Sequence, residues 1–250
     1  MHLERKAAQT AAWLRGKGVP DQSRALLVGT RRGGFSNELG RVVVLPLRRV
    51  PGCRVPLVPG WESVIISGEL AGAPAIVQEG RIHFFEGFLP GEVGFTVRVL
   101  AALGVRSLVL VAEGRPLPGV PGTEVTLAAD RIDLTGVPLL RGALAGPQGP
   151  VFEPAPPSPG MCGAIRAAAA AHGVRLAEGV VSLIHGPAWP TGAEARMMRT
   201  LGADVVTMAL APELATASRL GIDCAAILFD PAVGWERRHV DFCRDTLASI

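Results

Sequence analysis

Short apolar runs bounded by glycine or proline recur along the chain, and in its second half they alternate with amphipathic stretches. The apolar runs predict buried strands, and stretches with apolar residues three or four positions apart predict helices. Strands that alternate with helices favour a partly parallel sheet covered by helices on both faces. The expected strands are residues 24–29, 42–45, 64–66, 75–77, 107–111, 180–184, 204–208 and 224–229, and the expected helices are residues 95–103, 163–172, 193–201, 212–220 and 236–247.

The first 18 residues show the period of an amphipathic helix, with Leu3, Ala7, Ala11 and Leu14 on one face. Polar residues interrupt this stretch, so we interpret it as neither a signal peptide nor a membrane span. No segment elsewhere reaches the roughly 20 apolar residues that a spanning helix needs. We therefore expect a cytoplasmic protein that makes no contact with a membrane.

Proline interrupts the pattern most strongly between residues 143 and 160, where six prolines argue against a helix or a strand. We interpret this stretch as a long surface loop, because the strands on its two sides are too few to close separate sheets. A chain of 250 residues is long enough to bury one sizeable core. We therefore expect a single domain over residues 1–250.

Charge and cysteine content narrow the classes of partner. The net charge is only +3 and no run of Lys or Arg exceeds two residues, so the pattern of a nucleic-acid-binding protein is missing and a small anionic substrate fits better. The four cysteines form no C-x-x-C pair and have no histidine at metal-site spacing. We expect no bound metal, and we expect the thiols to be reduced and mostly buried. They belong to Cys53, Cys162, Cys224 and Cys243.

The sequence GRIHFFEGF, residues 80–88, places Arg81 and His83 two positions apart. On a strand these two side chains would share one face, where a guanidinium and an imidazole could meet one anion. A solvated strand edge explains the same pattern equally well. A second candidate is the turn VGTRRGG, residues 28–34, in which the Thr30 hydroxyl could donate to an anion, although its spacing is that of neither a P-loop nor a dinucleotide-binding turn.

Residues 185–213 contain further candidates. Thr191 and Glu194 form a capping box that predicts a helix start. Trp189 before it is either a stacking platform for a planar ring or a large core residue. Asp230, at the end of a later apolar strand, precedes a proline, and the commonest use of an Asp-Pro pair is to cap a turn through its own backbone.

In this order, these segments resemble the trimeric purine nucleoside phosphorylases and their methylthioadenosine phosphorylase relatives. GRIHFFEGF is similar to the family pattern G-R-x-H-x-Y-E-G-Y, and DRIDLTGVPLLRG is similar to D-H-I-N-L-x-G-x-N-P-L-x-G. The most specific match is the segment GPAWPTGAEARMMRTLGADVVTMALAPE, and the resemblance extends over about residues 24–230. It implies a three-layer α/β/α sandwich around a central mixed sheet, a homotrimer, and cleavage of a purine nucleoside by inorganic phosphate without a metal or organic cofactor.

The resemblance also implies roles for individual residues. Phosphate would be held by the Thr30 hydroxyl, a bidentate Arg81, His83 and the backbone of Glu113. Asp230 would meet the purine near N7 and help the base to leave, so Asp230 and His83 are the expected catalytic residues. The expected substrate-binding residues beside base and sugar are Phe85, Trp189, Met208 and Asp230.

Several positions depart from the family pattern. The small turn T-N-A-A-G-G becomes VAEGRP, which brings Glu113 to the expected phosphate site, and Ala209 replaces a serine that donates to phosphate. Pro190 replaces the base-reading glutamate, whereas Asp230 favours 6-aminopurine or 5′-methylthio nucleosides. The extra guanidinium groups that could compensate for the added carboxylate belong to Arg31, Arg32 and Arg115.

Two functions follow from these matches and departures. The first is a pentosyltransferase of purine salvage that converts purine nucleosides and phosphate to free base and (deoxy)ribose 1-phosphate. The second is a catalytically weak or inactive family member that binds a nucleoside or nucleotide as a sensor or a structural protein.

Overall fold

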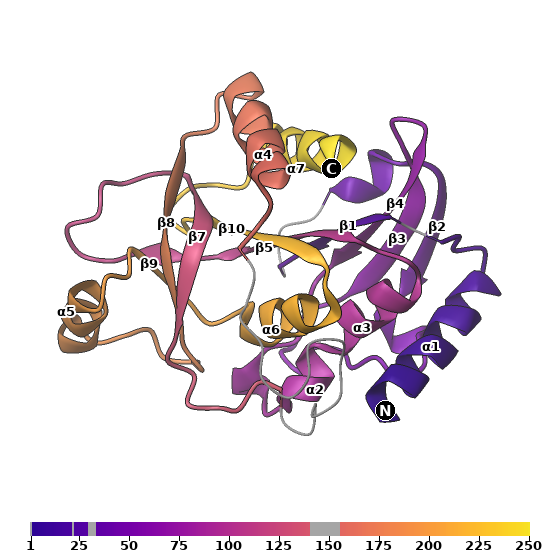
Figure 1. Cartoon of the computed structure of the whole chain (residues 1–250), viewed down its shortest axis with the longest axis horizontal. Coiled ribbons are helices and arrows are strands. Elements are labelled where there is room, and N and C mark those ends of the chain that lie inside the picture. Colours follow the sequence, from indigo (N-terminus) through magenta and orange to yellow (C-terminus); the bar gives the residue numbers. More distant parts are fainter. Residues whose placement is uncertain (1, 22, 30–33, 141–155) are drawn as a thin grey trace.

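A ten-stranded mixed sheet forms the centre of the protein, seen in a computed structural model that describes residues 2–21, 23–29, 34–140 and 156–250 (Figure 1). The strands lie in the order β2-β3-β4-β1-β5-β10-β7-β8-β9-β6. They are β1 (Arg24–Val28), β2 (Gly40–Pro46), β3 (Val64–Leu70), β4 (Ala73–Glu79), β5 (Ser107–Glu113), β6 (Arg115–Pro116), β7 (Val125–Asp133), β8 (Leu176–Leu183), β9 (Val205–Thr207) and β10 (Asp223–Phe229).

Strand direction determines where polar side chains can converge. Strands β4, β1, β5 and β10 are mutually parallel neighbours, and so are β7, β8 and β9. Antiparallel pairs join β2 to β3, β3 to β4, β10 to β7 and β6 to β9. The carboxyl ends of β4, β1 and β5 therefore lie at one edge of the sheet, which is where ligands bind in open sheets of this kind.

Helices cover both faces of the sheet (Figure 1). On one face lie α1 (His2–Arg15), α2 (Pro90–Val93), α3 (Phe95–Ala102) and α6 (Ala211–Leu220), and on the other lie α4 (Pro159–Ala171) and α7 (Arg237–Ser249). Each layer packs its own buried apolar cluster against the sheet. The helix α5 (Gly192–Thr200) covers a third, smaller cluster beside β9. These layers confirm the expected α/β sandwich around a mixed sheet.

The expected elements are confirmed, and α1 buries Ala7, Ala11 and Leu14 as its period predicts. Two strands were not expected, the short β6 and the long β7, whose apolar run stops at Ala129 because charged residues follow. The prediction of a loop over residues 143–160 is wrong at its end. Pro159 begins α4, because proline fits the first turn of a helix and the Ser158 hydroxyl accepts a hydrogen bond from the Met161 amide (3.2 Å). Residues 143–155 of that loop lie outside the described residues.

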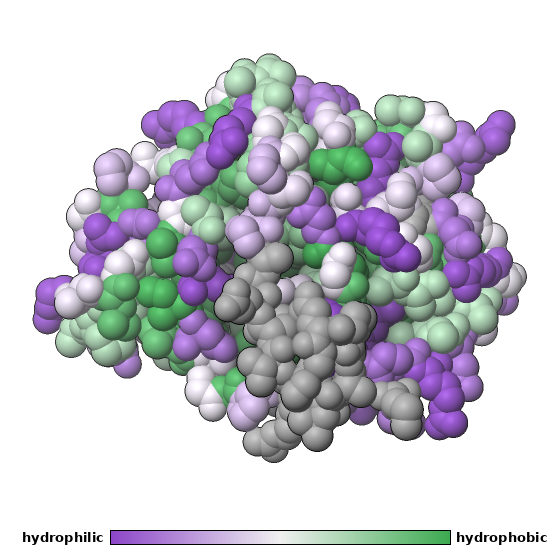
Figure 2. Space-filling model, viewed as in Figure 1, coloured by the Kyte–Doolittle hydropathy of each residue, from purple (hydrophilic) through white to green (hydrophobic). Residues whose placement is uncertain are grey.

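The solvent exposure of the cysteines corrects the expectation that most of them are buried. All four cysteines are free thiols, but only Cys243 is buried and the other three are partly exposed. Within the described ranges, no helix is both long and apolar enough to cross a bilayer. On the face shown in Figure 2, hydrophilic and hydrophobic side chains are interspersed.

Candidate active site

A pocket of about 190 Å³ lies at the sheet edge where β5 and β9 end and where the chain leaves β1 and β4. Its lining includes Gly29, Trp61, Ala112 and Thr207. Segments that are far apart in the sequence therefore meet here. Six of the residues assigned by resemblance line it: Arg81, His83, Phe85, Glu113, Trp189 and Met208.

Arg81 and His83 line the pocket, but they do not lie on a strand, which corrects the expected geometry. Strand β4 ends at Glu79, and Gly80 takes a left-handed conformation with φ of 80°. A Cβ atom at Gly80 would lie 2.1 Å from the Glu62 carbonyl oxygen, so the chain turns where only glycine fits. After this turn, Arg81 and His83 both line the pocket.

The Arg81 guanidinium is buried and has protein partners. Its Nη2 atom donates to the Leu27 carbonyl (2.8 Å) and to the Val111 carbonyl (2.5 Å), and its Nη1 atom lies 3.4 Å from Oε1 of Glu213. Arg81 thus joins the carboxyl ends of β1 and β5 to α6. A bidentate contact with phosphate would require the guanidinium to release these carbonyls.

Glu213 is a buried partner that the sequence did not reveal. It lies in the first turn of α6, and both it and Arg81 have side chains that are 3% exposed. Burial raises the pKa of Glu213, and the nearby charge of Arg81 opposes that rise. Glu213 ends the segment that is similar to the family pattern, but no role was assigned to it from the sequence.

His83 is oriented by Glu86. The Glu86 Oε1 atom lies 3.2 Å from Nδ1 of His83 and accepts the His83 backbone amide at 2.7 Å, while Oε2 accepts the Leu57 amide at 2.6 Å. Burial alone would raise the pKa of Glu86, but these hydrogen bonds outweigh it and lower the pKa. An ionised carboxylate only accepts, so Nδ1 of His83 carries a proton and Nε2 is left for another partner.

Aromatic rings form one wall of the pocket. The His83 and Phe85 rings stack with centroids 4.8 Å apart and an interplanar angle of 17°. Trp61 meets both edge-on, at 5.4 Å from His83 and 6.3 Å from Phe85. By resemblance, Trp61 takes the position of the histidine in the family's P-G-H loop, but no role was assigned to it from the sequence.

The opposite wall follows β9. The Thr207 hydroxyl donates to the Glu113 carbonyl (2.6 Å), which ties β9 to the end of β5, and Met208 and Ala209 come next in the lining. The Glu113 residue is exposed at the mouth. The Trp189 ring is covered by the Arg115 guanidinium, whose central carbon lies 4.0 Å from the ring centroid. The indole is therefore held by a cation–π contact.

Two predicted residues are not brought to this pocket. Asp230 follows β10, and its Oδ1 atom accepts the Ala232 amide at 2.9 Å, which is the turn-capping use of an Asp-Pro pair. It does not line the pocket. Thr30 lies outside the described residues, as do Arg31 and Arg32, although Gly29 lines the pocket.

The described part of the site has the chemistry of a small-anion site beside a planar ring. A buried guanidinium and an imidazole supply positive charge and donors, and the aromatic wall offers a surface for a base or a sugar. Within the described residues, no three His, Cys, Asp or Glu side chains gather as metal ligands.

Comparisons with known proteins agree with this arrangement. The profile of the phosphorylase superfamily matches residues 33–247. The chain is 30% identical over 223 residues to purine nucleoside phosphorylase 1 of Geobacillus stearothermophilus, which covers 88% of this chain and 81% of that protein. It is 33% identical over 220 residues to the purine nucleoside phosphorylase of Cellulomonas sp, with 84% of this chain and 74% of that protein covered.

Solved structures match over nearly the whole chain. A purine nucleoside phosphorylase in complex with ribose-1-phosphate superposes with a TM-score of 0.82 at 23% identity, covering 99% of this chain and 96% of that one. The Schistosoma mansoni enzyme in complex with BCX-34 gives 0.84 at 22% identity, with 100% and 97% covered. These matches establish the fold.

Proposed function

The chain belongs to the phosphorylase superfamily, and on that premise we propose that it is a pentosyltransferase that cleaves purine nucleosides with inorganic phosphate. The products are the free purine base and (deoxy)ribose 1-phosphate. One observation carries the proposal: Arg81, His83 and an aromatic wall converge in one pocket at the carboxyl edge of the sheet. The two relatives described above are named purine nucleoside phosphorylases, which supports the same reaction.

Among the residues proposed to donate a hydrogen bond to phosphate, His83 has the clearest geometry. Its Nδ1 proton is directed to Glu86, so Nε2 donates to an anion only when the ring carries both protons. In the proposed site, Arg81 adds a fixed positive charge from the wall, Thr30 adds its hydroxyl, and the backbone of Glu113 completes the cradle.

The nucleoside is proposed to lie against Phe85, Trp189 and Met208, which line the same pocket. Asp230 is proposed to meet the base and to favour 6-aminopurine or 5′-methylthio nucleosides. Because its carboxylate is bonded to the Ala232 amide outside the pocket lining, this assignment needs its own test. If it is right, Asp230→Asn changes the ratio of kcat/KM for adenosine to that for inosine, and an unchanged ratio removes Asp230 from base recognition.

A homotrimer in the cytoplasm, acting in purine salvage, is part of the same proposal and rests on the resemblance to the trimeric phosphorylases. Sedimentation velocity of the purified protein tests the assembly. A monomer at micromolar concentration would contradict it.

A second function is favoured by Glu113, which places a carboxylate at the pocket mouth, and by Arg81, whose guanidinium is engaged by protein partners. Both features weaken an anion site. A weak or inactive family member would bind a nucleoside or nucleotide as a sensor or structural protein. Purine ligands would then raise the melting temperature without any release of base.

One assay distinguishes these functions. Release of free base is measured from adenosine, inosine, guanosine and methylthioadenosine, with and without phosphate. Phosphate-dependent release supports the proposal, equal release in both conditions indicates a hydrolase, and thermal stabilisation without release indicates the binding protein.

A matched pair of histidine variants sharpens the assay. His83 stacks on Phe85 inside the pocket, whereas His185 is exposed and stacks on Phe84 outside it. We expect His83→Ala to raise the KM for phosphate at least about tenfold, because a charge-assisted hydrogen bond is lost. His185→Ala should leave this KM unchanged.

A further inference from the structure

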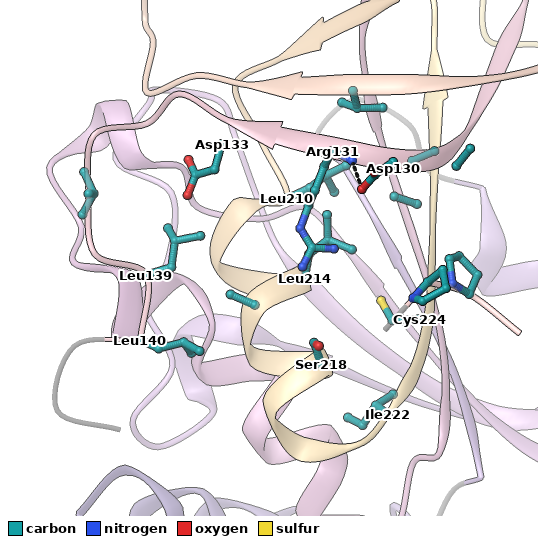
Figure 3. Close-up of a pocket in the computed structure, with 18 of the residues that line it drawn as sticks. Asp130, Arg131, Asp133, Leu139, Leu140, Leu210, Leu214, Ser218, Ile222 and Cys224 are labelled. Carbon is teal, nitrogen blue, oxygen red and sulfur yellow. Dashed lines mark hydrogen bonds between the residues drawn. The ribbon is translucent and has the colours of Figure 1, made fainter. Parts of the chain in front are cut away.

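A second and larger cavity, of about 840 Å³, opens between β7, β10 and α6 (Figure 3). Among the described residues, it shares no lining residue with the candidate active site. Its walls are mainly apolar, with Leu139 and Leu140 on one side, Leu210 just before α6, Leu214 on α6, and Ile222 at the far end. A cavity of this size and character is typical of a small-molecule site.

A bulge in β7 brings one cation into this cavity. The register between β7 and β8 shifts between Ala128 and Asp130, so one extra residue is inserted there. Without it, Ala128 and Arg131 would point to opposite faces of the sheet; with it, both line the cavity. Ile132, on the opposite face, packs instead on the cluster under α5.

The Arg131 side chain extends from β7 toward Leu210 and Leu214 (Figure 3). It is half-buried, and across the described ranges its guanidinium makes neither a hydrogen bond nor an ion pair. Burial lowers the pKa of Arg131, although Cys224 and the neighbouring aspartates oppose that shift. A guanidinium in apolar surroundings without an acceptor is costly, and a bound anion would remove that cost.

Two carboxylates belong to the same cavity and restrict the anion it can take. Asp130 accepts the Arg131 backbone amide (2.7 Å), and Asp133 accepts the Thr135 amide and hydroxyl (2.9 and 2.7 Å). Both residues are exposed to solvent, which screens them. They still disfavour a ligand with two negative charges, so a single charge suits the cavity best.

We propose that this cavity is a binding site for a small organic monoanion with an apolar body, whose carboxylate pairs with Arg131 while its hydrocarbon part packs on Leu139, Leu210 and Leu214. The proposal does not rest on the phosphorylase reaction, because none of the described residues lines both pockets. Failure of one proposal therefore leaves the other standing.

Octanoate is a suitable probe, with octan-1-ol as its neutral counterpart, both measured by titration calorimetry on the full chain. We expect saturable binding of octanoate that is at least about tenfold tighter than that of octanol, because only the carboxylate pairs with the guanidinium. Arg131→Gln should remove this preference and leave octanol binding unchanged. Arg48→Gln, an exposed arginine outside the cavity, is the control and should bind octanoate as the wild type does.

A second variant keeps the test independent of Arg131. Ala128→Phe places a ring into the cavity and should block octanoate while the melting temperature stays near that of the wild type. Absence of saturable octanoate binding, equal affinity for octanoate and octanol, or wild-type octanoate affinity in Arg131→Gln would each overturn the proposal. A change in sedimentation on Arg131→Gln without octanoate binding would instead assign this face to contact with another copy of the chain.

Discussion

Arg81 and Glu213 form an ion pair in the interior of the protein, with 3.4 Å between Nη1 and Oε1 and only 3% of each side chain exposed, although 132 positions separate them in the sequence. The pair fixes the segment after β4 against the first turn of α6. It therefore holds one wall of the candidate active site in place.

Removing one member of this pair should be costly. We expect Glu213→Ala to lower the free energy of unfolding by about 3–5 kcal/mol, because it leaves the Arg81 charge buried without its carboxylate. Urea unfolding measures the change. The control is Glu69→Gln, which breaks an exposed pair with Arg41 and should cost about 1 kcal/mol or less. Similar small losses in both variants would show that Glu213 does not stabilise the buried charge.

The turn at Gly80 can be tested against a glycine with nearly the same backbone angle. Gly80 and Gly72 have φ of 80° and 75°, but a Cβ at Gly80 would meet the Glu62 carbonyl at 2.1 Å, whereas nothing lies within 4 Å of one at Gly72. We expect Gly72→Ala to cost about 1–2 kcal/mol and Gly80→Ala more than about 3 kcal/mol, because only the second adds a clash. Equal losses on thermal unfolding would mean that backbone angle alone decides both.

The carboxylate of Glu86 should make stability depend on pH. Its folded-state pKa lies below the ordinary value of 4.5, so its contribution is fully present above that value and is lost as the pH falls through the folded-state pKa. The stability difference between wild type and Glu86→Gln should therefore be largest above pH 4.5 and shrink in more acidic solution. Urea unfolding over a series of pH values measures it. A difference that stays constant with pH would show that Glu86 does not act through its charge.

Glu113 should weaken phosphate binding, since this acidic residue lines the pocket. The residue is exposed, so the repulsion is of the order of 1 kcal/mol, as for two charges in water. We expect Glu113→Gln to lower the KM for phosphate by about fivefold with little change in kcat. Steady-state kinetics at fixed nucleoside concentration provide the measurement. A higher KM would instead mean that the carboxylate organises the site.

The alternation of apolar and amphipathic runs was enough to predict the sheet and its covering helices, because each buried strand or helix carries its own period. The strand β7 was not predicted from this pattern. Its second half carries Asp130, Arg131 and Asp133, and a bulge shifts the period where the charges begin. The pattern of apolar and polar residues within β7 does not reveal such a bulge, because a bulge is defined by the hydrogen-bonding register with the neighbouring strand β8.

The candidate site was predictable in its membership more than in its geometry. The motif around residues 80–88 placed Arg81 and His83 together, and both residues line one pocket. The partners of Arg81 depend on which elements lie side by side, so the sequence did not pair Arg81 with Leu27, Val111 or Glu213. For Asp230 the simpler interpretation, a cap on its own turn, describes the observed hydrogen bond.

The two carbonyls held by Arg81 have a consequence for how this protein and its kin are compared. An arginine that donates hydrogen bonds to the carbonyls near the ends of two adjacent strands stabilises the sheet whether or not the protein is catalytically active. Its presence in a distant homologue would indicate shared ancestry, and its loss would first lower the stability of the fold. The neighbouring imidazole makes no such structural tie between strands, so it is the better diagnostic of a working enzyme.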